Sequence, residues 1–550
     1  MYPEENNLKA FGQRRAHENE GHSNESTRAI MSSVTGFRTI PTFLDFHASS
    51  RPDAVAVIVE NNTGVTQSLT WSELRILANR AGNWICAQGL CKGDTIILHI
   101  PNSLDFFVLW LAASLTGVVT VPVDPKSTVP ELNYIIDHSD ARIVVTQEST
   151  VNVARSACMG CSKVARIIST SLTKVFSESE FGTEVLSQPG LRPAYNPTPL
   201  DVVGILYTSG TTGKPKGVVL THAVYLHGAE LLVRATALSL KDRHMIVLPL
   251  HHAAAQCHAM IPSLVSGASI VILERFSPSN FIDAAIRHTA TRAALFATPL
   301  RMLLSHHLSN EVPSNPLQLI TFGQSLTIEE LASWRAGFRI PLMQVWGMTE
   351  MAALPIMTPL NGPRDPLCMG LPVAGYDVKI VDQHGSEVVP GMSGEIILRV
   401  DPGWSATLGY YKNPTATVEL IRDGWLWTGD RAAQDENGEF HFLGRLKEMI
   451  KRAGENISPV EIEEVLKTHP AIYDAAVVGV PDTVRDERVI AYVIMRPGKQ
   501  VSAEKLQEWC RERLSPFKIP EEVHCRDEFP RTSVGKIQRH HLRDCYLRDL

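Results

Sequence analysis

Cysteine, surplus positive charge and long apolar segments are all scarce in this 550-residue chain, and each scarcity excludes a class of protein. The nine cysteines are scattered and odd in number, which argues against a disulfide framework and favours a reducing, cytoplasmic location. Cys158 and Cys161 form a CxxC with no second pair or histidine cluster nearby, so ordinary thiols are favoured over a zinc or redox site. A net charge of −6 leaves no basic surplus for nucleic acid or an anionic membrane.

The one long uncharged run, FFVLWLAASLTGVVTVPV, extends from Phe106 to Val123. A membrane-spanning helix needs about 20 apolar residues, and this run contains Gly117 and Pro122. It therefore predicts a buried helix and a buried strand, joined at Thr116–Gly117, and no transmembrane segment. Residues 1–35 are polar and lack the apolar core of a secretory signal, so we expect a disordered leader.

The length predicts about three or four compact units. In the middle of the chain, short β-rich apolar runs alternate with helix-length segments such as WSELRILANRAGNWICAQGL. This alternation predicts an α/β fold with a mainly parallel sheet covered by helices. The expected strands are TIILHI (95–100), ARIVVT (141–146), VVGILYT (202–208), MIVLPL (245–250), SIVILE (269–274) and AALFATP (293–299).

The texture changes at about residue 370, where turns at DQHG and VPGMSG follow one another closely, as in antiparallel hairpins. We expect a large N-terminal region over 36–444 that includes a β-rich subdomain at about 370–444. A hinge at 445–447 would lead to a small, mobile α+β C-terminal domain at 448–550, built from AAVVGV, RVIAYVIM and the amphipathic segment AEKLQEWCRERL.

Residues 207–218 read YTSGTTGKPKGV, with three glycines, five hydroxyls and two lysines. The run follows an expected strand and precedes an expected helix that begins at THAVYLHGAELL. Glycines expose successive backbone N–H groups, which form an anion nest, and the hydroxyls and lysines add donors. The pattern does not fit a Walker A loop, and the alternative is a hydroxyl-rich surface turn. The composition favours a polyphosphate site.

The same run resembles the phosphate-binding signature of the AMP-forming acyl- and aryl-CoA synthetases, adenylation domains and luciferases. Further motifs occur in the order of that family: VWGMTE (345–350), DGWLWTGD (423–430), GRLKEMIKRAGENISPVEIE (444–463) and PRTSVGKIQR (530–539). The resemblance covers about residues 40–545. Within the family, HPAIYDAAVVGVPDTVRDERVIAYVI and the ending KIPEEVHCRDEFPRTSVGKIQR are most similar in texture to the crotonobetaine/carnitine-CoA ligase branch.

The resemblance implies a two-step reaction with ATP, Mg²⁺ and coenzyme A. A small-molecule carboxylate attacks the α-phosphorus of ATP, which gives an acyl-adenylate and pyrophosphate, and a thiol then displaces AMP. Charge develops on phosphate oxygens, so catalysis depends on positioning and on cationic groups. The small domain would change its orientation between the two steps, a domain alternation about the hinge at Lys447.

The resemblance also assigns roles to residues. Lys536, in VGKI, would bridge the carboxylate and the α-phosphate, whereas the plain alternative is a solvated surface lysine. Glu350 would bind Mg²⁺ as a hard carboxylate ligand, and Thr349 would donate its hydroxyl to the α-phosphate. The phosphate loop would comprise Thr208, Ser209, Gly210, Thr211, Thr212, Gly213, Lys214 and Lys216.

For the nucleoside, Trp346 replaces the usual Tyr of the family and would stack on adenine, together with Gly347 and Met348. As a lone Trp it would more often be a core residue. Asp430 would accept hydrogen bonds from the ribose hydroxyls, and Arg445 would reach the same ribose.

Gly454 would let the pantetheine arm of coenzyme A pass, since a Cβ would obstruct the tunnel. The run ITFGQSLT (320–327) departs from the family pattern, so Gly323, Gln324 and Ser325 are assigned to the adenine and acyl contacts by position alone.

The acyl side is predicted from LPLHHAAAQCH (248–258). His252 matches the position at the wall of the carboxylate pocket, although a histidine here can also be a hydrogen-bonded core residue. Ala253, Ala254 and Ala255 leave room, unless they simply allow close helix packing. No acid is present in HHAAAQ to hold an ammonium group, which favours a bulky, largely apolar carboxylic acid.

Several alternatives stay open. The enzyme could load a carrier protein, make only the adenylate, or act as a crotonobetaine/carnitine-CoA ligase. A luciferase-like oxygenase shares the motifs, and a binding protein with an inactive site is a different class. The sequence leaves the acid, the pathway and the oligomeric state, including a homodimer, undetermined.

Overall fold

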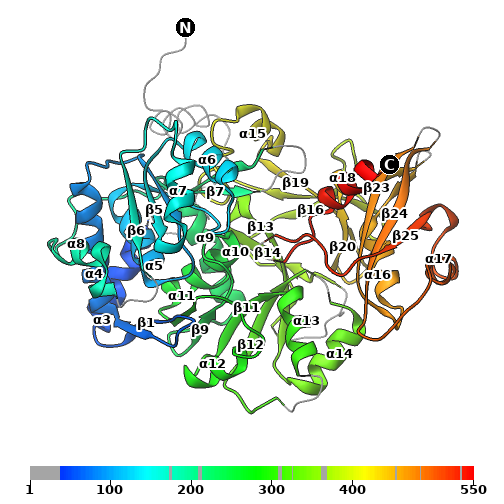
Figure 1. Cartoon of the computed structure of the whole chain (residues 1–550), viewed down its shortest axis with the longest axis horizontal. Coiled ribbons are helices and arrows are strands. Elements are labelled where there is room, and N and C mark those ends of the chain that lie inside the picture. The colour runs from blue at the N-terminus through cyan, green and yellow to red at the C-terminus, as the bar shows by residue number, and fades with distance from the viewer. Residues whose placement is uncertain are drawn as a thin grey trace, which may run out of the picture.

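The computed structural model describes residues 38–171, 176–208, 214–307, 312–324, 326–360, 368–452, 455–482, 485–532 and 535–549 (Figure 1). The expected leader at 1–35 lies outside these ranges. Two mainly parallel sheets with helices form the larger part of the molecule, which confirms the predicted α/β class.

The larger sheet has the order β15-β14-β13-β12-β11-β9-β10-β1-β2 and is parallel from β13 to β1. Its short antiparallel edges are β14–β15 on one side and β2 on the other. The strands are β1 (Val55–Glu60), β2 (Thr66–Thr70), β9 (Arg243–Ile246), β10 (Ser269–Leu273), β11 (Arg292–Phe296), β12 (Leu319–Gly323), β13 (Leu342–Met348), β14 (Ala353–Met357) and β15 (Leu371–Pro372).

The second sheet has the order β6-β5-β3-β4-β7-β8, with only the β7–β8 pair antiparallel. Its strands are β3 (Thr95–His99), β4 (Val119–Pro122), β5 (Ala141–Gln147), β6 (Arg166–Thr170), β7 (Val202–Thr208) and β8 (Lys216–Thr221).

The uncharged run folds as predicted. Helix α5 (Leu104–Thr116) is buried at every position and ends where Gly117 takes the left-handed conformation (φ 72°), a common helix C-cap. Strand β4 then begins at Val119. Among the described residues, no helix combines the length and hydropathy needed to cross a membrane.

Helices lie along the sheets and between them (Figure 1). The helices of this region are α3 (Ile40–Ser50), α4 (Trp71–Ala87), α6 (Val129–His138), α7 (Val151–Ala157), α8 (Glu180–Leu186), α9 (His222–Thr236), α10 (Ala253–Ala255), the π-helical turn η3 (Gln256–Met260), α11 (Ile261–Ser266), α12 (Phe281–Arg287), α13 (Ala297–His306) and α14 (Ile328–Gly337).

An antiparallel sheet follows, as the hairpin spacing predicts. It contains β16 (Val378–Val381), β17 (Ser393–Arg399), β18 (Ile421–Arg422), β19 (Trp425–Gln434) and β20 (Phe440–Arg445), with α15 (Pro414–Leu420) beside it. The short turn η5 (Leu446–Glu448) leads out of β20.

The C-terminal unit combines another sheet with α16 (Pro459–Lys467), α17 (Ala503–Arg511) and α18 (Arg539–Asp549). Its strands are β21 (Ile450–Arg452), β22 (Glu455–Ile457), β23 (Ile472–Asp482), β24 (Asp486–Met495) and β25 (Glu522–Cys525). In Figure 1 this unit lies beside β20 and the α13–α14 pair.

Two local predictions were wrong, and one strand was missed. The expected strand 293–299 ends at Phe296, because Ala297 begins α13. The expected strand 245–250 belongs to β9, which ends at Ile246. The helix expected from THAVYLHGAELL is confirmed, since α9 begins at His222 with Thr221 as its N-cap, but the strand β8, which returns antiparallel to β7 before it, was missed.

Candidate active site

The candidate residues gather where strands of the larger sheet end. Phe296 and Gly323 are the last residues of the neighbouring parallel strands β11 and β12 and lie opposite each other in register. Met348 ends β13, the next strand. The carboxyl ends of parallel strands open toward one edge of the sheet, which is the usual place for a ligand in an α/β fold.

Asp430 and Arg445 form a pair across the antiparallel strands β19 and β20. The Arg445 Nε atom lies 3.0 Å from Asp430 Oδ1, and the indole Nε1 of Trp346 donates to Asp430 Oδ2 at 3.0 Å. Burial raises the pKa of Asp430, and the charge of Arg445 opposes this shift. The structure thus brings together three residues that are distant in sequence around one buried carboxylate.

Glu350 lies in the turn η4 (Thr349–Met351) that follows β13, and its side chain is buried. Tyr410 donates its hydroxyl to Glu350 Oε1 at 2.7 Å. The Lys216 ammonium lies 4.8 Å from the centre of the same tyrosine ring, a cation–π contact. Lys216 begins β8, so the return from the glycine-rich run is next to the expected metal ligand.

The C-terminal unit brings Lys536 to this edge. Its neighbour Gly535 has a left-handed backbone (φ 82°), and the Gly535 carbonyl accepts from Thr298 Oγ1 (3.3 Å), on α13, and from Arg531 (2.8 Å). Lys536 Nζ lies 6.0 Å from the centre of the Phe296 ring. The lysine loop is therefore seated on the large region, between α13 and the end of β11.

The Lys536 side chain remains accessible to solvent within this cleft. The surrounding protein lowers the pKa of Lys536 through desolvation, and the charge of Arg445 lowers it further. The carboxylates of Asp430, Glu448 and Glu350 act in the opposite direction. Lys536 is thus close enough to both the Asp430–Arg445 pair and Glu350 to interact with their charges.

His252 also contacts the ring of Phe296. The two rings are perpendicular, with centres 6.2 Å apart, and His252 Nδ1 accepts from the Ala254 N–H at 3.1 Å as the N-cap of α10. Burial, and then the positive charge of Lys536, hold the pKa of His252 well below its usual value. His252 is consequently neutral at physiological pH and forms part of a wall facing the lysine.

Gly323 allows the close approach that builds this wall. A Cβ at this position would lie 3.0 Å from the Phe296 ring, tighter than ordinary contact. Gln324, the next residue, has φ 72°, an uncommon value for a residue with a side chain. Gly347 is exposed, whereas Met348 and Thr349 are half-buried beside Glu350.

The remaining predicted residues are exposed, lie at the base of the glycine-rich run, or fall outside the described residues. Lys214 is exposed, and its ammonium lies 4.9 Å from the ring centre of Tyr134, on α6. Thr208 pairs with Lys216 at the base of the β7–β8 hairpin, and Lys447 is exposed within η5. Outside the described residues lie Ser209, Gly210, Thr211, Thr212, Gly213, Ser325 and Gly454.

The sequence analysis missed Phe296, Thr298, Tyr410 and Glu448. Phe296 contacts both Lys536 and His252, and Glu448 pairs with Arg539 of α18 at 2.9 Å. Tyr410 lies in LGYYKNP, where no local pattern indicates a partner sixty residues away in sequence. The cue available for Phe296 is its place in the predicted parallel strand 293–299, whose carboxyl end is where a ligand usually binds.

The described residues of this site do not form a complete set of protein ligands for a metal ion. Within the described part of the chain, no cluster of three or more His, Cys, Asp or Glu side chains is arranged to hold an ion. Mg²⁺ commonly takes one or two carboxylates and completes its coordination with phosphate oxygens and water. The buried carboxylate of Glu350, beside the return of the glycine-rich run, fits that mode of binding.

The site combines the Asp430–Arg445 pair, Lys536 from the C-terminal unit and Glu350 directly after β13. This combination is typical of an adenylate-forming enzyme. The model of the AMP-binding enzyme family matches residues 44–411, and the model of its C-terminal domain matches 461–536. The chain therefore belongs to the AMP-binding enzyme family.

Among curated relatives, the chain is similar to the crotonobetaine/carnitine–CoA ligase of Proteus mirabilis, with 32% identity over 88% of this chain and 95% of the relative. A probable CoA ligase, CCL9, of Humulus lupulus is 31% identical over 87% and 92%. Among solved structures, the anthranilate CoA ligase AuaEII with anthranoyl-AMP has a TM-score of 0.85, at 25% identity over 94% of this chain and all of that one. ATP-bound MatB from Rhodopseudomonas palustris has a TM-score of 0.82, at 26% identity over 92% and 99%.

These findings confirm the family resemblance found in the sequence. The protein is an AMP-forming acyl-CoA synthetase, an acid–thiol ligase, and its substrates and cofactors are a carboxylic acid, ATP, Mg²⁺ and coenzyme A.

Proposed function

We propose that this enzyme activates a bulky, largely apolar carboxylic acid and transfers it to coenzyme A. The observation that carries the proposal is the position of Lys536, which lies close to both the Asp430–Arg445 pair and the Phe296–His252 wall. A cation in this position can stabilise the negative charge that develops where a carboxylate meets the α-phosphate.

Each residue then has a separate task. Asp430 and Arg445 orient the ribose, and Trp346 holds Asp430 while its ring faces the base. Glu350 would hold Mg²⁺, which neutralises phosphate charge when bound. Thr349 and the phosphate loop, including Lys216, donate to the phosphates. Because Arg445 and Tyr410 already hold the carboxylates of Asp430 and Glu350, little reorganisation of these two groups is needed during the reaction.

The nature of the acid is argued from the wall. The groups whose charges act on His252 are Lys536, His251 and His258, all of them bases. Within the described residues Asp124 lies 3.7 Å from His251, but no carboxylate acts on His252 itself. A quaternary ammonium or an amino group beside His252 would therefore be poorly compensated, and burying an unpaired charge is costly. Ala253, Ala254 and Ala255 are small and buried. This argues against the betaine substrates in the names of the Proteus relatives.

The test is acid-dependent pyrophosphate release across fatty, aryl, terpenoid, betaine and amino acids, with coenzyme A added in a second assay. We expect the highest kcat/KM for a bulky apolar acid, and AMP plus a thioester after coenzyme A is added. The highest kcat/KM for a carnitine-like acid or an amino acid would overturn the acid assignment and favour the crotonobetaine/carnitine-CoA ligase alternative.

The acceptor can be tested separately through Gly454, which belongs to the motif that suggests a pantetheine passage. Gly454→Trp should lower thioester formation on the order of 10²-fold by misplacing the thiol, and leave pyrophosphate release intact. Loss of both steps together would contradict this division. AMP release in wild-type enzyme only with a carrier protein, or adenylate without thioester, would establish the alternatives of carrier loading or adenylate formation alone.

Three broader features stay part of the proposal. Rotation about residues 445–447 would carry the small domain, 448–550, between the two steps. A cytoplasmic location rests on the scattered cysteines, which are free thiols in the described residues. A homodimer is left to a measurement of mass in solution.

A further inference from the structure

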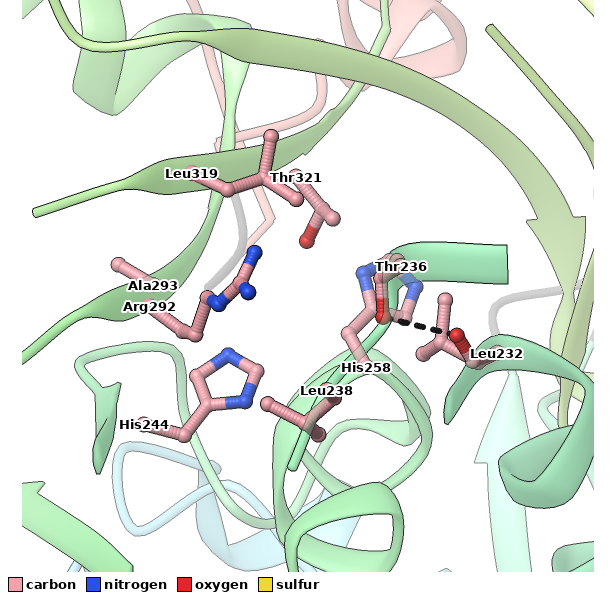
Figure 2. A pocket seen from close by; sticks show the side chains of 9 residues that line it. All are labelled: Leu232, Thr236, Leu238, His244, His258, Arg292, Ala293, Leu319 and Thr321. Carbon is pink, nitrogen blue, oxygen red and sulfur yellow. Dashed lines mark hydrogen bonds between the residues drawn. The ribbon is translucent and has the colours of Figure 1, made fainter. Parts of the chain in front are cut away.

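A small cavity lies within the large region, between the larger sheet and α9 (Figure 2). Figure 2 shows four polar side chains that point toward a common space: His244 of β9, Arg292 of β11, Thr321 of β12 and His258 of η3. The rest of the lining is mostly apolar and consists of Leu232, Thr236, Leu238, Ala293 and Leu319.

Several polar atoms of this cavity are buried without a hydrogen-bond partner in the described residues. His244 is 4% exposed, and neither of its ring nitrogens has a hydrogen-bond partner among the described residues. His258 Nδ1 and the Thr321 hydroxyl also have no hydrogen-bond partner among the described residues. Leaving a buried polar atom unpaired is costly, so such a group usually has a hydrogen-bond partner from the protein, from water or from a ligand. Four such atoms around one cavity indicate a site for a polar group.

The cavity faces the same side of the sheet as the wall of the acyl site. Side chains alternate along a strand, so Arg292, Ala294 and Phe296 share one face of β11, and Thr321 and Gly323 share one face of β12. Arg292 and Phe296 are four residues apart, which corresponds to ~13 Å along the strand. The cavity therefore lies on the same face of the sheet as Phe296, but at the opposite end of β11.

The turn η3 connects the two places. It follows directly after His252 and α10, and it is a π-helix, a form that often occurs at functional sites. His258, in this turn, lines the cavity, and the charge of Lys536 also acts on it. One short segment therefore carries both the wall residue His252 and the cavity residue His258.

The charge of the cavity is balanced. Arg292 Nε donates to Asp242 Oδ1 at 2.9 Å, and Asp242 also accepts from Thr291 and from the backbone of Ser239. Burial lowers the pKa of His244 to about 3 and that of His258 to about 4, so both rings are neutral at pH 7. A carboxylate or an ammonium would therefore enter without a free counter-charge, whereas a neutral oxygen could accept hydrogen bonds from these groups.

We infer that the acid substrate carries a neutral oxygen function, a hydroxyl or a carbonyl, at the end far from its carboxylate, and that His244, His258, Arg292 and Thr321 bind this group. The inference rests on the proposed function and narrows its acid: the body of the molecule is apolar and its far end is polar.

The test compares matched straight-chain and aryl-alkanoic acids of about eight to fourteen carbons, a range that includes ~13 Å, with a methyl, hydroxyl, keto, carboxylate or amino group at the far end. We expect kcat/KM for pyrophosphate release to be about tenfold or more higher with the hydroxyl or keto acid of the right length than with its methyl analogue, because the analogue leaves buried polar groups unpaired.

Two variants assign the effect to the cavity. Thr321→Val removes only the hydroxyl from a side chain of the same shape, and His244→Phe keeps a ring and removes both nitrogens. Either should reduce the preference for the oxygenated acid about three- to tenfold. Thr66→Val, on the exposed edge strand β2, is the matched control and should retain the preference. Thermal unfolding of each variant identifies a folding defect, and one folded cavity variant is sufficient for the comparison.

The outcomes separate the two proposals. Equal kcat/KM for methyl and oxygenated acids, with pyrophosphate released, overturns this inference alone, as does an oxygen preference that survives in the folded cavity variants. A preference for carboxylate or amino ends overturns the charge argument and therefore the inference. No release with any acid overturns the proposed function and this inference with it.

Discussion

The nucleotide side and the acyl side of the cleft differ in whether their polar side chains have partners. On the nucleotide side, charges are paired: Asp430 faces Arg445 and Trp346, and Glu350 accepts from Tyr410. On the acyl side, the histidines are neutral, and several buried polar atoms have no partner in the described part of the chain. The paired charges of the nucleotide side suit ATP, whose charge is the same in every reaction. On the acyl side, hydrogen bonds and shape select the acid.

Lys536→Ala tests whether the two sides depend on one shared cation, and it should have the largest effect. Loss of one preorganised donor typically costs on the order of 10²–10³ in rate, about 3–4 kcal/mol, so adenylate formation should fall by this factor for every acid tested. ATP–pyrophosphate exchange measures it. Lys499→Ala, an exposed residue of the same domain, serves as control, and near wild-type exchange in Lys536→Ala would remove the lysine from its assigned role.

Asp430→Asn should affect the nucleotide side alone. The amide retains an acceptor for Trp346 but loses the charge opposite Arg445. Hydrogen bonds to charged groups contribute about 1.5–3 kcal/mol, so the KM for ATP should rise about 10- to 100-fold while the KM for the acid is unchanged. Asp435→Asn, in the β19–β20 turn, is the control. An equal rise in both KM values would break the separation of the two sides.

His252→Asn is the reciprocal change on the acyl side. Asparagine is a good N-cap and should preserve the start of α10, but it removes the ring from its contact with Phe296. Aromatic pairs contribute about 0.5–1.5 kcal/mol, so we expect the KM for the acid to rise about two- to tenfold with the KM for ATP unchanged. Steady-state kinetics with each substrate varied in turn decides this, and an effect confined to ATP would refute it.

Glu448→Gln should have the smallest effect at neutral pH, less than about threefold, because a partly exposed charge contributes little. Glu448 favours the protonated form of Lys536, so its neutralisation should lower the pKa of Lys536 further. The active ammonium form is lost as pH rises through this pKa. The alkaline limb of the adenylation profile should therefore move to lower pH, but should not move in Glu461→Gln, whose carboxylate pairs with Lys518.

Local signals in the sequence were enough for much of the fold. The change from helix to strand at Gly117 was predicted because a glycine interrupts an apolar run, and the parallel sheets follow from alternating β-rich and helical segments. The segment 216–221 was missed because its apolar residues directly follow the glycine-rich run, and whether they form a strand depends on pairing with β7. Ala297 could not be separated from the preceding strand because Ala and Leu suit both structures.

The candidate site also contains residues that local motifs predicted and contacts that they did not. Motifs predicted Asp430, Arg445, Glu350 and Lys536, and the structure places them together. Contacts such as Tyr410 with Glu350 and the convergence of His244, Arg292 and Thr321 are tertiary. They depend on which strands become neighbours and on which face each residue occupies, and neither is encoded by spacing within one segment.

Arg445 has a consequence for the order of events because it ends β20 immediately before η5. A rotation at the hinge residue Lys447 would carry Lys536 away, yet the register that aligns Asp430 with Arg445 would stay intact. The nucleoside could then keep its contacts while the catalytic lysine departs and a thiol enters. Such an anchor would hold the nucleoside of the adenylate in place until the thiol has displaced AMP.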